Sequence, residues 1–186
     1  FHYCVQRSCN EREAAHCLKD NIDAVDDALG LVRDLSVDLR PPLLDDLGLA
    51  TALCWYIDRY EKRVGVTTEV VIQLPNQNER FSLELETAFF RVAQEALTNV
   101  ARHAHATHVL MELTRTTTGL DMIVRDDGVG FDPTALRKRA RRAATLGLVG
   151  MQERAHAAGG VVEIHSKPGR GTEVPFSVTV HNIHPE

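Results

Sequence analysis

Apolar side chains recur every three or four positions in the first part of the chain: Leu18, Ile22, Val25, Leu29, Val32, Leu35 and Leu39. This spacing predicts a helix over residues 11–40 with a narrow apolar stripe close to a heptad repeat. The stripe fits packing on the helix's own domain, or a seam shared with a second helix. Pro41 and Pro42 end the helix, because the residue before a proline is driven out of the α region.

Beyond the prolines, helical and extended patterns alternate. Further helices are predicted at 47–60, 82–104 and 147–158. Short β-branched or alternating runs predict strands at 67–74, 107–115, 120–126, 161–166 and 172–180. Asp46 is a candidate N-cap for the helix that Gly65 ends, and residues 132–146 resemble a loop. This order predicts an α+β fold, a two-layer α/β sandwich whose mixed sheet carries helices on one face, preceded by helices.

Composition narrows the class of protein. The 186 residues are 44% hydrophobic and 25% charged, as in ordinary soluble globular proteins. A net charge of −5 predicts no general attraction to nucleic acid or to anionic membranes. The sequence contains no run of 18 apolar residues and no signal-peptide pattern at its N-terminus, so we expect this segment to be cytoplasmic and not membrane-spanning.

The four cysteines form no CxxC pair; they are Cys4, Cys9, Cys17 and Cys54. Reduced thiols are the expected state in a cytosolic protein. A zinc site built from Cys4, Cys9, His16 and Cys17 is the alternative, although its spacing does not match the usual zinc motifs.

The predicted helix 82–104 carries polar residues in register. Glu95, Asn99 and His103 follow each other at intervals of four and share one face, while the opposite face is apolar. Carboxylate and amide oxygens suit Mg²⁺, which usually completes its coordination shell with waters and phosphate oxygens. The alternative is a solvated face of a surface helix.

Three glycine-containing elements follow this helix. Asp126–Gly130 ends a predicted strand, where a carboxylate can accept a hydrogen bond from a purine amino group and glycine lets a ligand approach the backbone. Gly147–Met151 opens a predicted helix, whose N-terminal amides can bind phosphate. Gly169–Thr172 joins two predicted strands. Taken singly, each is also compatible with an ordinary turn.

Taken together, the segments resemble a known family. Glu95–Asn99, Asp126–Phe131, Gly147–Met151 and Gly169–Thr172 match, in order and spacing, the N, G1, G2 and G3 boxes of the ATP-binding domain of sensor histidine kinases, a GHKL-type domain related to those of gyrase and MutL. Asp34–Leu49 resembles the end of the dimerisation region in the nitrate-sensor-like, NarL-partner subfamily. The resemblance covers about residues 22–180.

The resemblance implies binding of ATP and Mg²⁺. Asn99 would coordinate Mg²⁺ at the ATP phosphates, and Glu95 would order the water shell of the ion or act as a base. Arg102 and His103 would lie near the phosphates, and Asp126 would accept the adenine amino group.

The glycine boxes would complete the site. Gly128 and Gly130 would let the lid start close to the base, and Thr172 would hydrogen-bond near the adenine. Residues of the G2 box would also contact ATP, its glycines leaving room for the phosphates: Gly147, Leu148 and Gly150. Residues 132–146 would form the ATP lid, and its basic residues would help hold polyphosphate or remain solvated: Arg137, Lys138, Arg139, Arg141 and Arg142.

The implied architecture is a partial dimerisation region at 1–60 and an ATP-binding catalytic domain at 61–182. The full-length protein would be a homodimer that phosphorylates a histidine for relay to a response regulator. The phosphoacceptor is not identified, because His16 is followed by Cys17 rather than an acidic residue and lies too close to Pro41 for a helical hairpin. We therefore expect the first dimerisation helix to be missing, or only partly present in residues 1–9, and the fragment to be unable to phosphorylate itself. The alternatives are a serine kinase of the anti-sigma-factor type and a non-catalytic ATP-binding or oligomerisation module.

Overall fold

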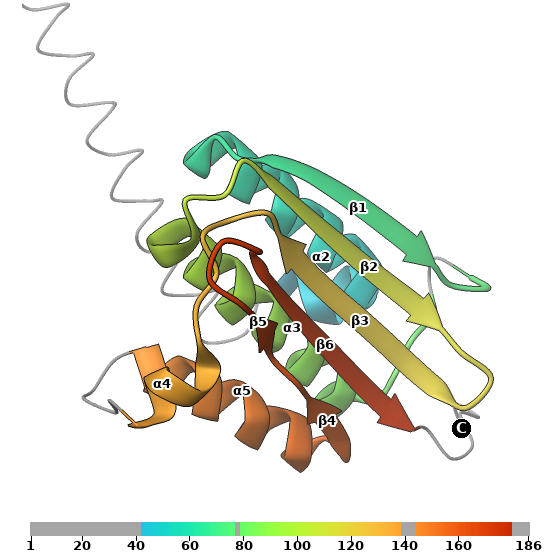
Figure 1. Ribbon diagram of the computed structural model, residues 1–186. Coiled ribbons are helices and arrows are strands. Elements are labelled where there is room, and N and C mark those ends of the chain that lie inside the picture. Colours follow the sequence, from blue (N-terminus) through green and yellow to red (C-terminus); the bar gives the residue numbers. More distant parts are fainter. Residues whose placement is uncertain (1–41, 77–78, 139–143, 180–186) are drawn as a thin grey trace, which may run out of the picture. The chain divides into compact units, whose positions relative to one another are not determined.

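The computed structural model describes residues 42–76, 79–138 and 144–179 (Figure 1). The predicted helix over 11–40, His16 and the candidate zinc site lie outside these residues. Cys54 is exposed and its thiol is free. Within the described ranges, no helix is both long enough and apolar enough to cross a membrane.

The described part of the chain contains one mixed sheet of six strands, in the order β1-β2-β3-β6-β4, with β5 also paired to β6. Their bounds are β1 Thr67–Gln73, β2 His108–Arg115, β3 Gly119–Asp126, β4 Gly160–Val162, β5 His165–Ser166 and β6 Thr172–Thr179. β1 runs parallel to β2, whereas the pairings of β3 and β6 are antiparallel. This sheet agrees with the predicted strands, except that the strand expected at 161–166 is divided into β4 and β5.

Helices cover one face of this sheet. Their bounds are α2 Pro42–Val64, α3 Leu83–Asn99, the π-helix η1 Val100–Ala104, α4 Pro133–Lys138 and α5 Ala144–Ala157. α2 and α3 lie next to each other behind the sheet in Figure 1, and α5 packs against α3 and β4. Leu120, Met122 and Val124 are buried along β3 while the residues between them are partly exposed, which is the alternation expected of a sheet with one covered face. The predicted two-layer α+β fold is confirmed.

The core joins the long helix to the middle of the sheet. Phe89 on α3 stacks on Phe176 of β6 with ring centroids 4.1 Å apart, and neither ring is exposed. Each buried aromatic side chain contributes on the order of 2 kcal/mol through its transfer out of water. This contact fixes α3 over β6 and therefore holds the C-terminal end of α3 above the ends of β3 and β6.

Two predictions between residues 132 and 158, the loop at 132–146 and the start of the helix at 147–158, are wrong. The segment predicted as a loop contains α4, and α5 begins at Ala144, three residues before Gly147. Asp132 caps α4, because its Oδ1 accepts hydrogen bonds from the amides of Thr134 and Ala135, and Pro133 suits the first helical position. Ala144 has a higher helix propensity than glycine, which favours the earlier start of α5.

Helix α2 is longer than predicted and is broken in its first part. Gly48 has φ 77° and ψ 176°, which no residue inside an α-helix adopts. Asp46 lies inside the segment before this break rather than at a helix start, whereas Gly65, with φ 75°, ends the helix as expected. α2 packs on α3 and β1, so residues 42–60 belong to the same compact unit as the sheet. The functional division at residue 60 stays a prediction.

Candidate functional site

A cavity of about 230 Å³ opens between the end of α3, the ends of β3 and β6, and α5. It is lined by Ala96, Asn99, Val100, His103, Ala104, Val124, Asp126, Gly130, Phe131, Leu148, Met151, Ile164, Thr172 and Val174. Segments that are far apart in the sequence therefore meet at one site. Asn99 and Asp126, which the sequence analysis assigned to opposite ends of one ligand, both line this cavity.

Asn99 is the last residue of α3 and lines the cavity. Its Nδ2 is buried and has no hydrogen-bond partner among the described residues. A buried polar group without a partner is costly, and rotation of the amide can present either its oxygen or its nitrogen. The amide is therefore available for a polar or ionic ligand in the cavity.

The helix predicted at 82–104 changes its winding at Asn99. Residues 100–104 form the π-helix η1, and Val100, His103 and Ala104 from this turn line the cavity. π-helical turns are rare and occur frequently at functional sites. The Ala104 carbonyl accepts the amide of Val129 at 2.8 Å, so this turn is attached to the loop that follows β3.

Asp126 ends β3 and pairs in register with Thr172, the first residue of β6. The side chain is buried, and its Oδ1 accepts the Gly128 amide at 2.8 Å. Burial raises the pKa of Asp126 above the ordinary value for an aspartate, while hydrogen bonds from Gly128 and Thr172 partly oppose the increase. A carboxylate kept in an otherwise apolar wall is suited to accept a hydrogen bond from a ligand N–H group.

Gly128 and Gly130, in the loop after β3, lie where no residue with a Cβ atom would fit. A Cβ on Gly128 would lie 2.3 Å from the Ala104 carbonyl oxygen, and one on Gly130 would lie 2.2 Å from the Lys167 carbonyl oxygen. Gly130 also has φ 58°, in the left-handed region. These close contacts attach the loop after β3 both to η1 and to the turn before β6.

Ser166 joins the first and third glycine elements, and sequence analysis missed it. Its hydroxyl accepts the Phe131 amide at 2.9 Å, donates to the Gly171 carbonyl at 2.9 Å, and lies 3.0 Å from the Thr172 hydroxyl. The Gly171 amide also donates to the Gly128 carbonyl at 2.8 Å. No local motif marks Ser166, because one of its partners, Phe131, lies 35 residues away in the sequence.

The second glycine element lies within the first half of α5. Leu148 and Met151 line the cavity. Gly147 faces α3, where a Cβ would lie 2.1 Å from Glu95 Oε1, so Glu95 lies against the start of α5 rather than in the cavity wall. The side chain of Arg154 lies where a Cβ on Gly150 would contact it, at 3.2 Å.

Some predicted site residues do not line the cavity: Glu95, Arg102, Gly128, Gly147 and Gly150. Arg102 is exposed on η1. The side chains of the basic cluster at 137–142 lie outside the described part of the structure. The apolar residues that line the cavity were not predicted as site residues. Two of them, Val124 on β3 and Val174 on β6, belong to the alternating pattern of buried residues along these strands.

The donor set near Asn99 suits a cation with few protein ligands. Within the described residues, no group of three or more histidine, cysteine, aspartate or glutamate side chains could hold a metal ion. Mg²⁺ typically binds through one or two protein oxygens, waters and the phosphates of its substrate. Asn99 fits that pattern, whereas a metal enclosed by protein ligands alone does not fit these residues.

Comparison with known proteins agrees with this geometry. Residues 84–182 match the family model described as "Histidine kinase-, DNA gyrase B-, and HSP90-like ATPase". This range includes α3, the loop after β3, α5 and β6, and therefore all the elements that form the cavity.

Two relatives are named as histidine kinases. An uncharacterized sensor-like histidine kinase of Chloroflexus aurantiacus is 36% identical over 152 residues, 81% of this chain and 26% of the relative. The signal transduction histidine-protein kinase/phosphatase DegS of Brevibacillus brevis is 34% identical over 168 residues, 90% of this chain and 42% of the relative. The chain thus spans less than half the length of these two relatives.

A solved structure supports the fold. The histidine kinase domain of the Erythrobacter litoralis EL346 blue-light activated kinase superposes with a TM-score of 0.57 at 19% identity, covering 70% of this chain and 60% of that one. With the cavity, the glycine elements and the match over 84–182 in agreement, the chain belongs to the histidine kinase-, DNA gyrase B- and HSP90-like family of ATP-binding domains.

Proposed function

We propose that this chain is the catalytic part of a sensor histidine kinase. It binds Mg-ATP, and in the full-length protein the γ-phosphoryl group passes to a histidine and then to an aspartate of a response regulator. The cavity that contains both Asn99 and Asp126 is the observation that carries this proposal. The two histidine-kinase relatives support the histidine-directed reaction. A homodimeric parent and a response regulator as partner are parts of the same proposal.

Asp126 recognises the base in this proposal. Its carboxylate accepts a hydrogen bond from the adenine amino group, with Thr172 beside it on β6 and Gly130 leaving space for the ring. The apolar walls from Val124, Met151 and Val174 exclude water from the faces of the base. Asp126 is therefore the residue that distinguishes a purine with an exocyclic amine from one with a carbonyl at that position.

Asn99 holds the phosphate end. Its amide oxygen coordinates Mg²⁺, and His103, one turn further along, lies beside the phosphates. Glu95 orders water around the ion or acts as a base, and the exposed Arg102 approaches from outside. The ion supplies neutralisation of the phosphate charge when bound, while these residues position the nucleotide, which is where most of the catalysis of phosphoryl transfer lies.

The G2 box and the lid complete the proposed site. Gly147, Leu148 and Gly150 on α5 leave backbone room for the phosphates, and Gly128 lets the lid over 132–146 start next to the base. The subsidiary proposal is that the parent belongs to the nitrate-sensor-like, NarL-partner subfamily, on the residues Asp34–Leu49.

Calorimetry with Mg-ATP tests the adenine role directly. We expect Asp126→Asn to abolish measurable ATP binding, because the amide presents an N–H group to the adenine amino group. Asp121→Asn is the matched control, since Asp121 lies on the same strand but points to the other face of the sheet. Unchanged ATP affinity in Asp126→Asn would refute the role assigned to the carboxylate.

The serine-kinase alternative predicts a different product. After incubation with labelled ATP and an acceptor protein, phosphohistidine is lost on acid treatment and phosphoserine is retained. We expect the label to be acid-labile. Label that survives acid would favour the anti-sigma-factor type of kinase, and binding of ATP with no transfer to any form that carries an acceptor would favour a non-catalytic module.

A further inference from the structure

Strand β1 is an outermost strand of the sheet, and alternate residues along it direct their backbone groups away from the sheet (Figure 1). β1 pairs in parallel with β2, and the Thr67 amide donates to the Thr107 carbonyl on the β2 side at 3.1 Å. Because successive residues of a strand direct their backbone groups to opposite sides, Thr68, Val70 and Ile72 present theirs at the outer edge.

The chain itself covers the amide of the first of these residues. Glu61 Oε2 on α2 accepts the Thr68 amide at 3.3 Å and also accepts a hydrogen bond from the Thr68 hydroxyl. Among the described residues, no donor or acceptor meets the outward groups of Val70 and Ile72. The outer edge of β1 therefore keeps two residues that each have a free donor and a free acceptor.

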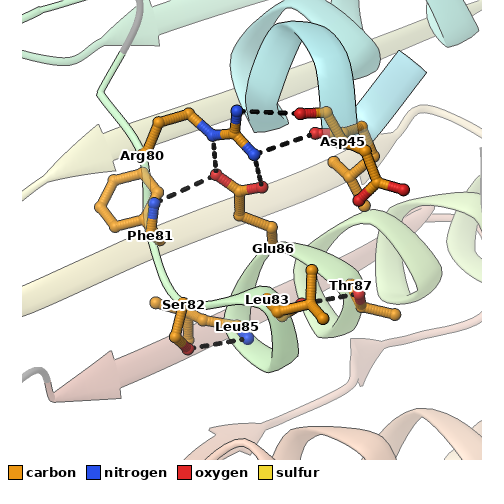
Figure 2. A network of polar contacts seen from close by, with 9 residues as sticks. Asp45, Arg80, Phe81, Ser82, Leu83, Leu85, Glu86 and Thr87 are labelled. Carbon is orange, nitrogen blue, oxygen red and sulfur yellow. Dashed lines mark hydrogen bonds and ion pairs between the residues drawn. The ribbon is translucent and has the colours of Figure 1, made fainter. Parts of the chain in front are cut away.

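Helix α2 is also fixed where its first turns meet the loop before α3 (Figure 2). Arg80 Nη1 donates to the Asp45 carbonyl at 3.0 Å, and Arg80 Nε forms an ion pair with Glu86 Oε1 at 3.0 Å. The Glu86 carboxylate is fully buried, and a buried carboxylate is destabilising unless it is paired, so this contact is not readily exchanged. With α2 attached near both of its ends, the contact between Glu61 and β1 is a fixed part of the edge.

β1 lacks the features by which exposed sheet edges usually avoid pairing. Its sequence, TTEVVIQ, contains no proline, glycine or lysine, and Glu69 is its one charged residue. Val70 and Ile72 lie on the helix-covered face of the sheet and Val71 on the open face, and all three are partly exposed. Since β-branched residues favour strand pairing and apolar surface gains from burial, this edge favours the addition of another strand.

We propose that the added strand is β1 of a second copy of this chain, paired antiparallel about a two-fold axis at Val71. In this register Val70 of each copy lies opposite Ile72 of the other, so every free donor and acceptor of these residues is paired. The two Val71 side chains meet on the open face of the sheet. Glu69 lies opposite Gln73 of the other copy, so no like charges are directly opposed.

Glu61 selects this register among the alternatives. Pairing centred on Val70 would place Thr68 opposite Ile72 and would need the Thr68 amide, which Glu61 already holds. Pairing centred on Ile72 would run past Gln73, where β1 ends. The contact is two-fold symmetric, so it joins two copies and does not propagate. It is independent of the proposed kinase reaction, and no residue of β1 lines the cavity.

Site-directed cross-linking of the 186-residue chain tests the register, after replacement of the four native cysteines by serine. Val71→Cys should form a disulfide-linked dimer on oxidation, because opposed residues of a non-hydrogen-bonded antiparallel pair have Cα atoms about 4.5 Å apart. Glu69→Cys is the matched control on the same strand and face. Two such residues would lie about 14 Å apart along the pair, so the yield of dimer should be about ten times lower.

A mixture of Glu69→Cys and Gln73→Cys chains should cross-link again, because these positions are opposed in the proposed register. Equal yields from Val71→Cys and Glu69→Cys alone, or no cross-link in Val71→Cys, would overturn the proposal.

Hydrogen exchange tests the pairing in the native sequence. The amides of Val70 and Ile72 should exchange about ten times more slowly at high than at low protein concentration. The amides of Glu69 and Val71 bond to β2 and should be protected at every concentration. Fast exchange of Val70 and Ile72 throughout would show that a second copy does not cover the edge. Protection that survives dilution, without a cross-link in Val71→Cys, would show that the chain covers its own edge. Either result would overturn the proposal.

Val71→Lys separates pairing from folding. It sets two ammonium groups directly opposite each other at the two-fold axis, where like charges are destabilising. Val161→Lys is the matched control, because Val161 is 63% exposed on β4 at the opposite edge of the sheet. Both variants should stay folded by circular dichroism, and only Val71→Lys should lose the concentration-dependent protection of Val70 and Ile72. Equal loss in both variants, or full protection in Val71→Lys, would refute pairing through β1.

Discussion

At the scale of single residues, Asp126 combines a proposed binding role with a cost in stability. Burial raises the pKa of its carboxyl, so the folded state favours the protonated form more than the unfolded chain does. Because the pKa is raised, the contribution of Asp126 to folding stability decreases with increasing pH. Stability falls as pH rises from the ordinary aspartate pKa through the raised one, and the deficit remains at neutral pH.

Asp126→Asn should therefore stabilise the nucleotide-free protein while removing ATP binding. We expect a gain in stability at pH 7, because the neutral amide avoids the desolvation of the charge and can keep the Gly128 hydrogen bond. The gain should shrink as the pH is lowered into the range in which the wild-type carboxyl is also protonated. Thermal unfolding followed by circular dichroism at both pH values measures it, and a lower melting temperature at pH 7 would contradict this account.

The polar residues of the cavity could be predicted from the sequence, but their hydrogen-bond partners and neighbours could not. Asn99 and His103 were predicted from their spacing on one helix, and Asp126 from its place at the end of a strand. That the amide of Asn99 lacks a partner within the described structure depends on which side chains surround it in space, which one-dimensional spacing does not contain. Glu95 shares the predicted helical face with Asn99, yet it lies against Gly147 because α5 packs over that turn.

At the scale of elements, the site depends on two loops being attached to each other. The loop after β3 and the turn before β6 meet at Ser166. Its hydroxyl accepts a hydrogen bond from the Phe131 amide and donates one to the Gly171 carbonyl. Ser166→Ala leaves both groups without this partner, at a cost of roughly 1–3 kcal/mol. We expect lower thermal stability and weaker ATP binding. Ser177→Ala on the exposed side of β6 is the control, and equal behaviour of the two variants would show that the attachment is unimportant.

The fit of Gly128 against η1 leads to a second expectation at this scale. Its added Cβ would overlap the Ala104 carbonyl, so Gly128→Ala should destabilise the fold by about 1–3 kcal/mol, as overpacking does. Gly169→Ala provides a comparison, because Gly169 has φ 75° and open space around it, and strain alone costs about 1–2 kcal/mol. Urea denaturation gives both values. Gly128→Ala should also weaken ATP binding, whereas Gly169→Ala should leave it nearly unchanged; the reverse order would argue against close packing at η1.

Element types were predictable where the local pattern is strong, and their irregularities were not. The strands β1, β2, β3 and β6 follow from alternation and β-branched residues. Next to the break at Gly48, the Asp45 carbonyl accepts a hydrogen bond from Arg80, 35 residues away. The Ala104 carbonyl, at the end of the π-helix η1, accepts one from Val129. Long-range hydrogen bonds of this kind override local propensity, so no window of sequence contains them.

At the scale of the whole molecule, nucleotide binding and folding are linked. A ligand that binds only the folded state stabilises it by an amount set by its concentration relative to its dissociation constant, about 2.7 kcal/mol at a hundredfold excess. The cavity draws on α3, β3, α5 and β6 together, so Mg-ATP should raise the unfolding temperature of the entire described unit in a single transition. Separate transitions, with only one of them shifted by nucleotide, would mean that the cavity is not shared in this way.

Removal of the metal separates the stabilisation that comes from the phosphate end of the nucleotide from the stabilisation that comes from its adenine end. In the wild-type chain we expect EDTA to reduce the ATP-induced increase in unfolding temperature substantially, because Asn99 then faces phosphates without the bridging ion, while adenine contacts at Asp126 persist. In Asn99→Ala the increase should be small and the same with and without Mg²⁺. Thermal shift measurements with ATP, with and without the chelator, provide the comparison, and GTP serves as the control for base recognition. If EDTA leaves the wild-type increase unchanged, Asn99 is not the magnesium ligand, even where the ATP dependence itself is observed.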